Sequence, residues 1–242
     1  MSGPRRLRAG VIAAGRGDRL RNGSAVLKPL IRVGGRTLIE RVLDSLADAG
    51  ASEVCVIINE DSLAVRDHVS TTAWPFTLRW IVETTPSSMH SFLRVVETLA
   101  ERGDSGPFLI STVDTVAPRG AYDGFLTDAG RHSDAVIALA ITPVADDEKP
   151  LLVRMKGSAV VAIGDAAAPA DYATAGYYVV WPSILREADA ARRDDVSALR
   201  TFFARLLARG YPVVGVHVPQ SIDVDRPLDV DAAEDFVKRV NL

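Results

Sequence analysis

Near its N-terminus the chain reads Ala13-Ala14-Gly15-Arg16-Gly17-Asp18-Arg19-Leu20, directly after an apolar run over 7–13. A short apolar run that ends in a glycine-containing loop predicts a buried strand followed by a tight turn. The two glycines let the backbone bring its N–H groups close to an anionic ligand. Arg19 and Lys28 add two cations. We therefore interpret this segment as a binding loop for the phosphates of a nucleoside triphosphate.

Two better-known phosphate motifs do not match this loop. The dinucleotide fingerprint requires a third small residue where Leu20 stands. A Walker loop requires Gly-Lys followed by Ser or Thr, and the chain contains no such string. A G-x-G alone is also typical of a plain strand-to-loop turn. The phosphate-binding interpretation consequently depends on Arg19 and Lys28.

The segment from Ala9 to Gly50 resembles the opening of one superfamily of nucleotidyltransferases, which act on sugar phosphates, molybdenum cofactor and alditol phosphates. Those enzymes begin with A-A-G-x-G-x-R-L, continue with K-P-L, and then form a V-G-G-x-P-L-I-x-x-V-L helix. Leu27 and Thr37 stand where that family commonly has proline. The resemblance implies that Arg19 and Lys28 are catalytic. It also implies that the nucleotide-binding loop consists of Ala13, Ala14, Gly15, Arg16, Gly17 and Asp18.

Strand-like and helix-like segments alternate along the first part of the chain. Strands are expected over 7–13, 53–58, 78–82, 107–113 and 135–141, and helices over 37–50, 61–69, 88–101 and 119–131. Short strands (151–155, 160–163, 177–181), helices (183–190, 196–208), a strand (213–218) and a helix from 227 follow. Alternation of this kind predicts a three-layer α/β fold with a mostly parallel central sheet and helices on both faces. The late short strands suggest a small acceptor-side β region appended to this sheet.

The resemblance implies a Rossmann-like nucleotide-diphospho-sugar transferase fold. We expect one nucleotidyltransferase domain over 1–242. Within it, residues 1–133 would form the nucleotide-binding half, and residues 134–242 the acceptor-binding half with the closing metal motif. The chain shows no repeat, low-complexity tract or long linker that would divide it further.

Acidic residues occur at two places where a metal could bind. Asp114 directly follows an apolar strand, and open α/β sheets place their ligands at such strand ends. A carboxylate there can hold Mg²⁺ or merely shape a turn. The resemblance implies a catalytic, metal-binding role for Asp114. Near the C-terminus, S-I-D-V-D-R-P over 221–227 resembles the closing motif of the family, which makes Asp223 the second Mg²⁺ ligand with Asp225 close by. The simpler alternative is that these acids only flank a helix start.

Two further segments suggest substrate contacts. Ser87 and Ser88 lie between a strand and a helix, where they could cap the helix. In the family this position contacts the nucleobase, so we expect both serines to bind nucleotide, with the base left open. The segment 173–185 resembles the N-A-G-I-Y-V-F-x-P-x-I-L of sugar-phosphate enzymes, which implies acceptor contacts at Thr174 and Gly176.

Composition limits the classes of protein that remain. The 242 residues carry a formal net charge of −3, which argues against nucleic acid as the main partner. No apolar run approaches the roughly 20 residues of a membrane span. The single Cys55 lies in an apolar run and is expected to be a buried thiol. These features favour a cytoplasmic protein, and a homodimer is compatible with them.

We therefore expect a Mg²⁺-dependent nucleotidyltransferase of the EC 2.7.7 type. It would transfer a nucleoside monophosphate from an NTP to a phosphorylated small molecule and release pyrophosphate. A sugar 1-phosphate is the leading acceptor. Cytidylyl transfer to an alditol, inositol or choline phosphate, and a molybdenum-cofactor acceptor, are the alternatives. A catalytically silent nucleotide-binding regulatory module is the alternative from a different class.

Overall fold

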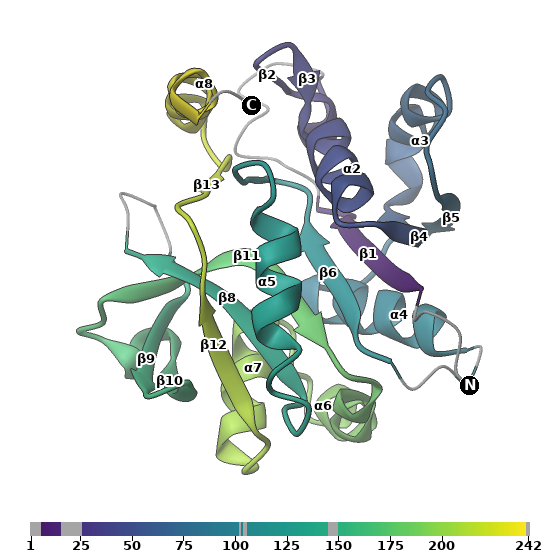
Figure 1. Ribbon diagram of the computed structural model, residues 1–242. Coiled ribbons are helices and arrows are strands. Elements are labelled where there is room, and N and C mark those ends of the chain that lie inside the picture. Colours follow the sequence, from purple (N-terminus) through teal and green to yellow (C-terminus); the bar gives the residue numbers. More distant parts are fainter. Residues whose placement is uncertain (1–5, 16–25, 102, 104–105, 145–149, 241–242) are drawn as a thin grey trace.

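The computed structural model describes residues 6–15, 26–101, 103, 106–144 and 150–240. A nine-stranded sheet with helices on both faces dominates this part of the chain (Figure 1). Its strands, in spatial order, are β5 (Thr77–Val82), β4 (Ala51–Ile58), β1 (Leu7–Ala13), β6 (Phe108–Thr112), β11 (Tyr172–Val180), β8 (Ile137–Pro143), β12 (Val213–His217), β10 (Ala159–Ile163) and β9 (Leu152–Lys156). The first four run parallel to one another, and β8 pairs with β12 in parallel.

Two layers of helices cover this sheet. One face carries α2 (Leu38–Asp48), α3 (Leu63–Val69) and α5 (Ala121–Ala129), and the other carries α4 (Ser88–Ala100), α6 (Ala188–Arg193) and α7 (Leu199–Ala208). Short 3₁₀ segments connect some of these elements: η1 (Lys28–Leu30), η2 (Glu60–Ser62), η3 (Gly164–Ala167) and η4 (Pro182–Glu187). Ile39 and Phe125 belong to the first core, and Phe92 and Phe202 to the second. The predicted three-layer α/β class is confirmed. The sheet itself is mixed, because β11 runs antiparallel to β6 and β8, and β10 runs antiparallel to β12 and β9.

A third, smaller core joins the C-terminal helix α8 (Pro227–Val240) to the N-terminal half of the chain. It includes Val33 from the hairpin of β2 (Arg32–Val33) and β3 (Arg36–Thr37), together with Val224 and Phe236. The short ladder between β7 (Thr115–Val116) and β13 (Ile222–Asp223) lies beside it. This packing carries the acidic C-terminal motif to the end of β6, more than 100 residues away in sequence.

Local sequence signals explain several element boundaries. Helix α2 begins with a capping box, in which Thr37 Oγ1 accepts from Glu40 N at 3.3 Å and Glu40 Oε2 accepts from Thr37 N at 2.8 Å. The helix ends just before Gly50, whose φ of 77° is a conformation that glycine adopts at little cost. Both ends of this helix were predicted from the sequence.

The structure differs from expectation in the second half of the chain. Only β9 and β10 form an edge hairpin, and they belong to the same sheet as the other strands. The third expected short strand is the nine-residue β11, which lies antiparallel between β6 and β8 near the centre of the sheet. The helix expected over 183–190 is the 3₁₀ segment η4 followed by α6. Neither Ser87 nor Ser88 caps α4 with its side chain.

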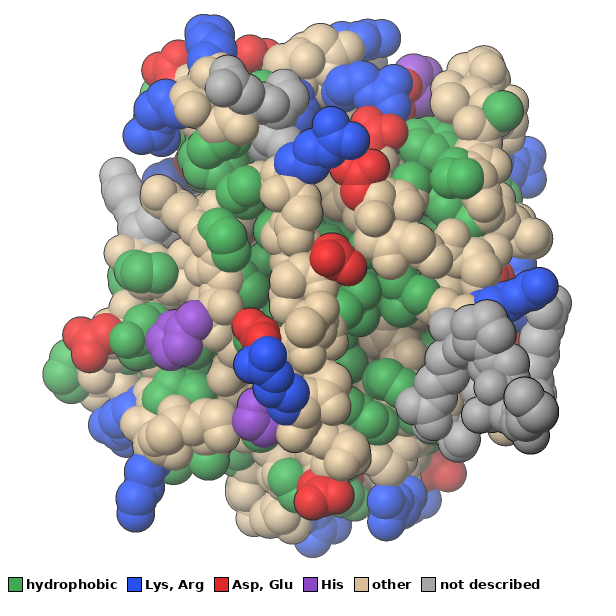
Figure 2. All heavy atoms as spheres, in the orientation of Figure 1, with side chains coloured by type: hydrophobic (Ala, Val, Ile, Leu, Met, Phe, Trp, Pro, Cys, Tyr) green, Lys and Arg blue, Asp and Glu red, His purple; other side chains and the backbone are tan. Residues whose placement is uncertain are grey.

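The surface and the helices show two further properties. Figure 2 shows acidic and basic side chains interspersed over the face that it draws. None of the described helices is long and apolar enough to cross a membrane.

Candidate active site

The candidate site lies where the carboxyl ends of β1 and β6 meet. These strands are neighbours in the sheet. The next sheet strand after β1 is β4, on one side of the pair, and the next sheet strand after β6 is β8, on the other side. Open α/β sheets bind ligands at such a switch point. Ala13 is buried at the end of β1, and Gly15 is exposed beyond it. Three residues of the predicted loop, Arg16, Gly17 and Asp18, and the predicted catalytic residue Arg19 lie outside the described residues.

The start of the loop is held by a residue that the sequence analysis did not single out. Asn59, which is 4% exposed at the end of β4, donates from Nδ2 to the carbonyl of Ala14 at 3.2 Å. Its Oδ1 accepts from the Ser62 hydroxyl at 2.7 Å. A buried Asn directly after an apolar strand was the available signal. The contact fixes the point at which the loop leaves the sheet.

The structure brings together three of the predicted site residues around one ammonium group. Lys28 Nζ lies 2.6 Å from Asp114 Oδ2 and 2.6 Å from Asp225 Oδ1. The Lys28 side chain is 11% exposed, that of Asp114 23% and that of Asp225 38%. Residues from three distant parts of the chain thus share one charged contact at the end of β6.

Protonation of the cluster follows from these contacts. Burial opposes ionisation of Asp114, but the Lys28 ammonium and a hydrogen bond from Thr112 outweigh it and hold the pKa of Asp114 below its usual range. Burial likewise opposes the charge on Lys28, yet the carboxylates of Asp114 and Asp225 raise its pKa above the usual value. At neutral pH the site therefore holds one ammonium between two carboxylates.

Asp223 occupies a different position from Asp225. In the β13–β7 ladder it pairs with Thr115, and its Oδ1 accepts from Thr115 Oγ1 at 2.8 Å. Val224 N donates to the carbonyl of Asp114 at 3.0 Å, which ties this ladder to the end of β6. The described residues contain no group of three or more His, Cys, Asp or Glu side chains that could hold a metal. The three predicted metal-binding aspartates therefore do not converge on one point in this arrangement.

Gly176 supports Asp223 indirectly. It has a φ of +78° at the irregular part of β11, and a Cβ atom there would overlap Thr115 Oγ1 and lie 2.9 Å from Thr112 Oγ1. The two threonine hydroxyls are 3.1 Å apart. Gly176 is therefore placed for close backbone approach to the residue that donates to Asp223.

Replacing Gly176 with Ala is expected to cost about 2–4 kcal/mol of unfolding free energy, because a strained left-handed residue and an overpacked contact add. Gly210 is the matched control, since it has a φ of +75° and open space around its Cβ position. Gly210→Ala should cost only the backbone part, about 1–2 kcal/mol. Urea unfolding of both variants measures the difference, and equal losses would show that the Thr115 contact is not tight.

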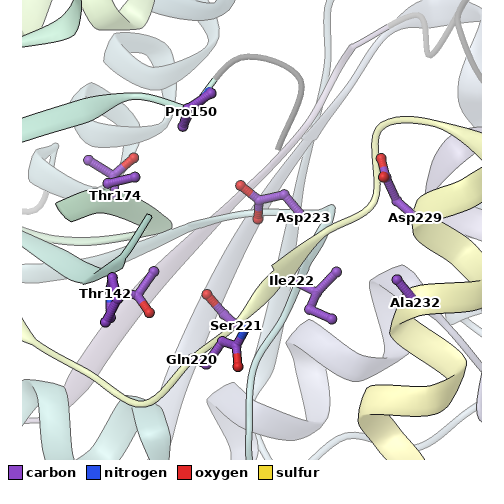
Figure 3. A pocket seen from close by; sticks show the side chains of 11 residues that line it. Thr142, Pro150, Thr174, Gln220, Ser221, Ile222, Asp223, Asp229 and Ala232 are labelled. Carbon is purple, nitrogen blue, oxygen red and sulfur yellow. The ribbon is translucent and has the colours of Figure 1, made fainter. Parts of the chain in front are cut away.

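Asp223 borders a cavity of about 210 Å³ (Figure 3). In Figure 3, Asp223 lies between Thr174 on one side and Asp229 on the other. The cavity is lined by Thr142, Pro143, Pro150, Ala173, Thr174, Gln220, Ser221, Ile222, Asp223, Asp229 and Ala232. Asp229 is engaged by Arg226, with Nη2 to Oδ1 at 2.8 Å. The predicted acceptor residue Thr174 thus lines a cavity that Asp223 borders.

The two serines predicted to contact the nucleotide lie at the start of α4 and differ in their contacts. Ser88 Oγ accepts from Leu199 N at 3.0 Å, which joins the starts of α4 and α7. Ser87 Oγ lies 2.8 Å from His90 Nδ1. Their roles in nucleotide binding stay predictions, and the Ser88 contact shows that this hydroxyl also holds two helices together.

Comparison with known proteins places the chain in a family. Residues 9–209 match the model of the MobA-like NTP transferase domain. The chain belongs to this family. The resemblance noted in the sequence is thereby confirmed, and the match includes the loop after β1, Lys28 and Asp114.

Curated relatives cover different shares of the chain. A Rubrobacter xylanophilus protein called bifunctional IPC transferase and DIPP synthase is 30% identical over 236 residues, which are 95% of this chain and 51% of that protein. Bifunctional protein GlmU of Anaeromyxobacter dehalogenans is 33% identical over 135 residues, covering 55% of this chain and 27% of GlmU. The chain thus spans about half, or less, of the length of these relatives.

Solved structures share the fold. An inositol-1-phosphate CTP transferase from T. maritima matches with a TM-score of 0.81 at 20% identity, covering 98% of this chain and 96% of that one. A putative glucose-1-phosphate thymidylyltransferase from Bacillus anthracis matches with a TM-score of 0.79 at 14% identity, covering 98% and 97%. At these identities the likeness establishes the nucleotidyltransferase fold.

Proposed function

We propose that this chain transfers a nucleoside monophosphate from an NTP to a phosphorylated small molecule and releases pyrophosphate. The observation that carries the proposal is the contact of Lys28 with Asp114 and Asp225 at the switch point of the sheet. Attack of one phosphate on another brings two polyanions together, so the protein must neutralise charge and hold the groups in line. A buried ammonium beside two carboxylates is suited to that task.

Each residue of the site has a role that follows from its chemistry. Lys28 would neutralise the α-phosphate and the incoming phosphate, since it is a largely buried cation at this strand end. Backbone N–H groups of the loop after β1 would hold the other phosphates, with Arg19 on the leaving pyrophosphate as the family resemblance implies. Asn59 would keep this loop in place through its contact with Ala14.

The donor set at this site suits Mg²⁺. Asp114 and Asp225 offer carboxylate oxygens that already share one cation. Mg²⁺ prefers oxygen ligands, and proteins usually bind it through only one or two carboxylates, with waters and substrate phosphates completing the coordination. We assign the metal to these two residues, with Asp223 as the third candidate ligand. The ion would screen the repulsion between the two phosphate groups when it is bound.

The acceptor side favours a neutral polyol attached to the reacting phosphate. The cavity offers hydroxyl and amide groups from Thr142, Thr174, Gln220 and Ser221, and its described lining contains no Lys or Arg to pair with a second anionic group. It also contains no aromatic ring of the kind that holds a choline ammonium. The Rubrobacter relative and the T. maritima structure support CTP and an inositol phosphate as first substrates to test. The second candidate is a sugar 1-phosphate, which the B. anthracis structure supports.

Pyrophosphate release over a matrix of substrates tests this function. CTP, UTP, dTTP, ATP and GTP are each combined with Mg²⁺ and with inositol 1-phosphate, glucose 1-phosphate, glycerol 3-phosphate or phosphocholine. We expect release with one NTP and a cyclic polyol phosphate, and loss of release with EDTA. Measurable NTP binding without release for any pair would instead favour the silent regulatory module.

A further inference from the structure

Lys28 Nζ lies between the two carboxylates to which the proposed function assigns the metal. Both of its ion pairs are 2.6 Å long, and each uses a carboxylate oxygen that would otherwise be available to a cation. Lys28 is the least exposed of the three side chains. Pro29, buried directly after it in η1, restricts the backbone at this point. The ammonium is therefore built into the cluster and does not simply approach it from solvent.

The charge balance shows what this contact does. Asp114 and Asp225 alone would carry two negative charges that share one site, an arrangement that attracts a divalent ion. With Lys28 between them the cluster carries a single negative charge. An entering cation would be repelled by the ammonium at short range in a partly desolvated site, where such repulsion is much stronger than in water. A nucleoside triphosphate removes this obstacle, because its phosphate oxygens offer the ammonium another partner and the metal further ligands.

We propose that Lys28 is an internal counter-ion for Asp114 and Asp225. It prevents a free divalent metal from binding to these carboxylates until the metal binds together with a nucleoside triphosphate. The inference rests on the proposed function, which assigns the metal to these two carboxylates. It goes further by assigning an order: the ammonium leaves the carboxylates for a phosphate when the metal–triphosphate complex binds. Lys28 thus makes metal binding depend on nucleotide.

Binding of Mn²⁺ to the full chain, followed by electron paramagnetic resonance of the free ion, tests this order. The chain is studied as wild type and as Lys28→Met, which keeps the length of the side chain without its charge. We expect Lys28→Met to bind Mn²⁺ without nucleotide at least about tenfold more tightly than wild type, since a nearby positive charge is removed. Lys238→Met is the matched control, because Lys238 makes an exposed ion pair with Asp235. Its Mn²⁺ affinity should equal that of wild type.

Lys28→Gln protects the test against a folding defect. The amide removes the charge but can still donate to one carboxylate, and its Mn²⁺ affinity should also exceed that of wild type. The tight binding should disappear when Asp114→Asn is added to either variant. Equal Mn²⁺ affinity in wild type and both variants, with Mn²⁺ bound by wild type when CTP is present, would overturn the inference and leave the proposed function standing. Absence of Mn²⁺ binding in all variants, with and without CTP, would overturn the metal assignment itself.

Discussion

Asp114→Asn is expected to reduce Mg²⁺-dependent pyrophosphate release by at least about a thousandfold while leaving the fold intact. Asn keeps the shape of the side chain but removes the charge that holds both the metal and Lys28. The measurement is release from the NTP and acceptor pair identified above, at saturating Mg²⁺. Asp44→Asn is the matched control, because Asp44 pairs with Arg36 on the surface of α2. Its rate should equal that of wild type.

Normal turnover in Asp114→Asn would show that the metal binds elsewhere. A thousandfold loss in Asp44→Asn as well would point to a general effect on folding. Circular dichroism of both variants separates these cases, since the helices that cover the sheet do not depend on Asp114.

The unfolding free energies of wild type and Asp114→Asn, compared at neutral and acid pH, test the charge state of Asp114. Its pKa is lower in the folded protein than the ordinary value of 3.8, because the Lys28 contact outweighs burial. The carboxylate therefore contributes stability above the ordinary pKa, and the contribution is lost as the pH falls through the lower folded value. The gap in unfolding free energy between wild type and Asp114→Asn should be larger at about pH 6 than at about pH 2. A gap that does not narrow in acid would show that Asp114 is neutral in the folded protein.

The features that sequence alone could establish are local ones. The first strand has the predicted bounds, Leu7–Ala13, because an apolar run ends in glycine. The capping box at Thr37 and Glu40 is a local feature of the same kind, since both partners lie within one turn of helix. Asp114 could be recognised as a candidate site residue because it comes after a buried strand.

The features that sequence could not establish depend on long-range pairing. Asp223 and Asp225 are two residues apart, and only the β13–β7 register decides that Asp223 meets Thr115 while Asp225 meets Lys28. The central position of β11 has a similar origin. The apolar pattern of its residues predicts a strand, but the packing of the whole sheet determines that this strand pairs with β6 and β8. The role of Asn59 depends on a partner 45 residues away.

Lys28→Met should produce two changes of opposite direction in one protein. Catalysis should fall by about a hundredfold to a thousandfold, because a positive charge is lost where negative charge develops in the transition state. Affinity for Mn²⁺ without nucleotide should rise, because the same charge no longer competes for Asp114 and Asp225. Stability should fall by about 1–3 kcal/mol, since a buried carboxylate loses its partner, and added Mn²⁺ should restore it.

The opposite signs distinguish this account from a simple structural defect. A misfolded site would bind both metal and substrate less well, so catalysis and Mn²⁺ affinity would fall together. Lys28→Arg provides the matched control for charge: it keeps the cation, so its metal binding should stay as weak as that of wild type. Its planar guanidinium differs in shape and donor geometry from the compact ammonium that meets the phosphate, so its rate should still fall. A Lys28→Met protein with both unchanged rate and unchanged Mn²⁺ affinity would place phosphate and metal chemistry away from the end of β6.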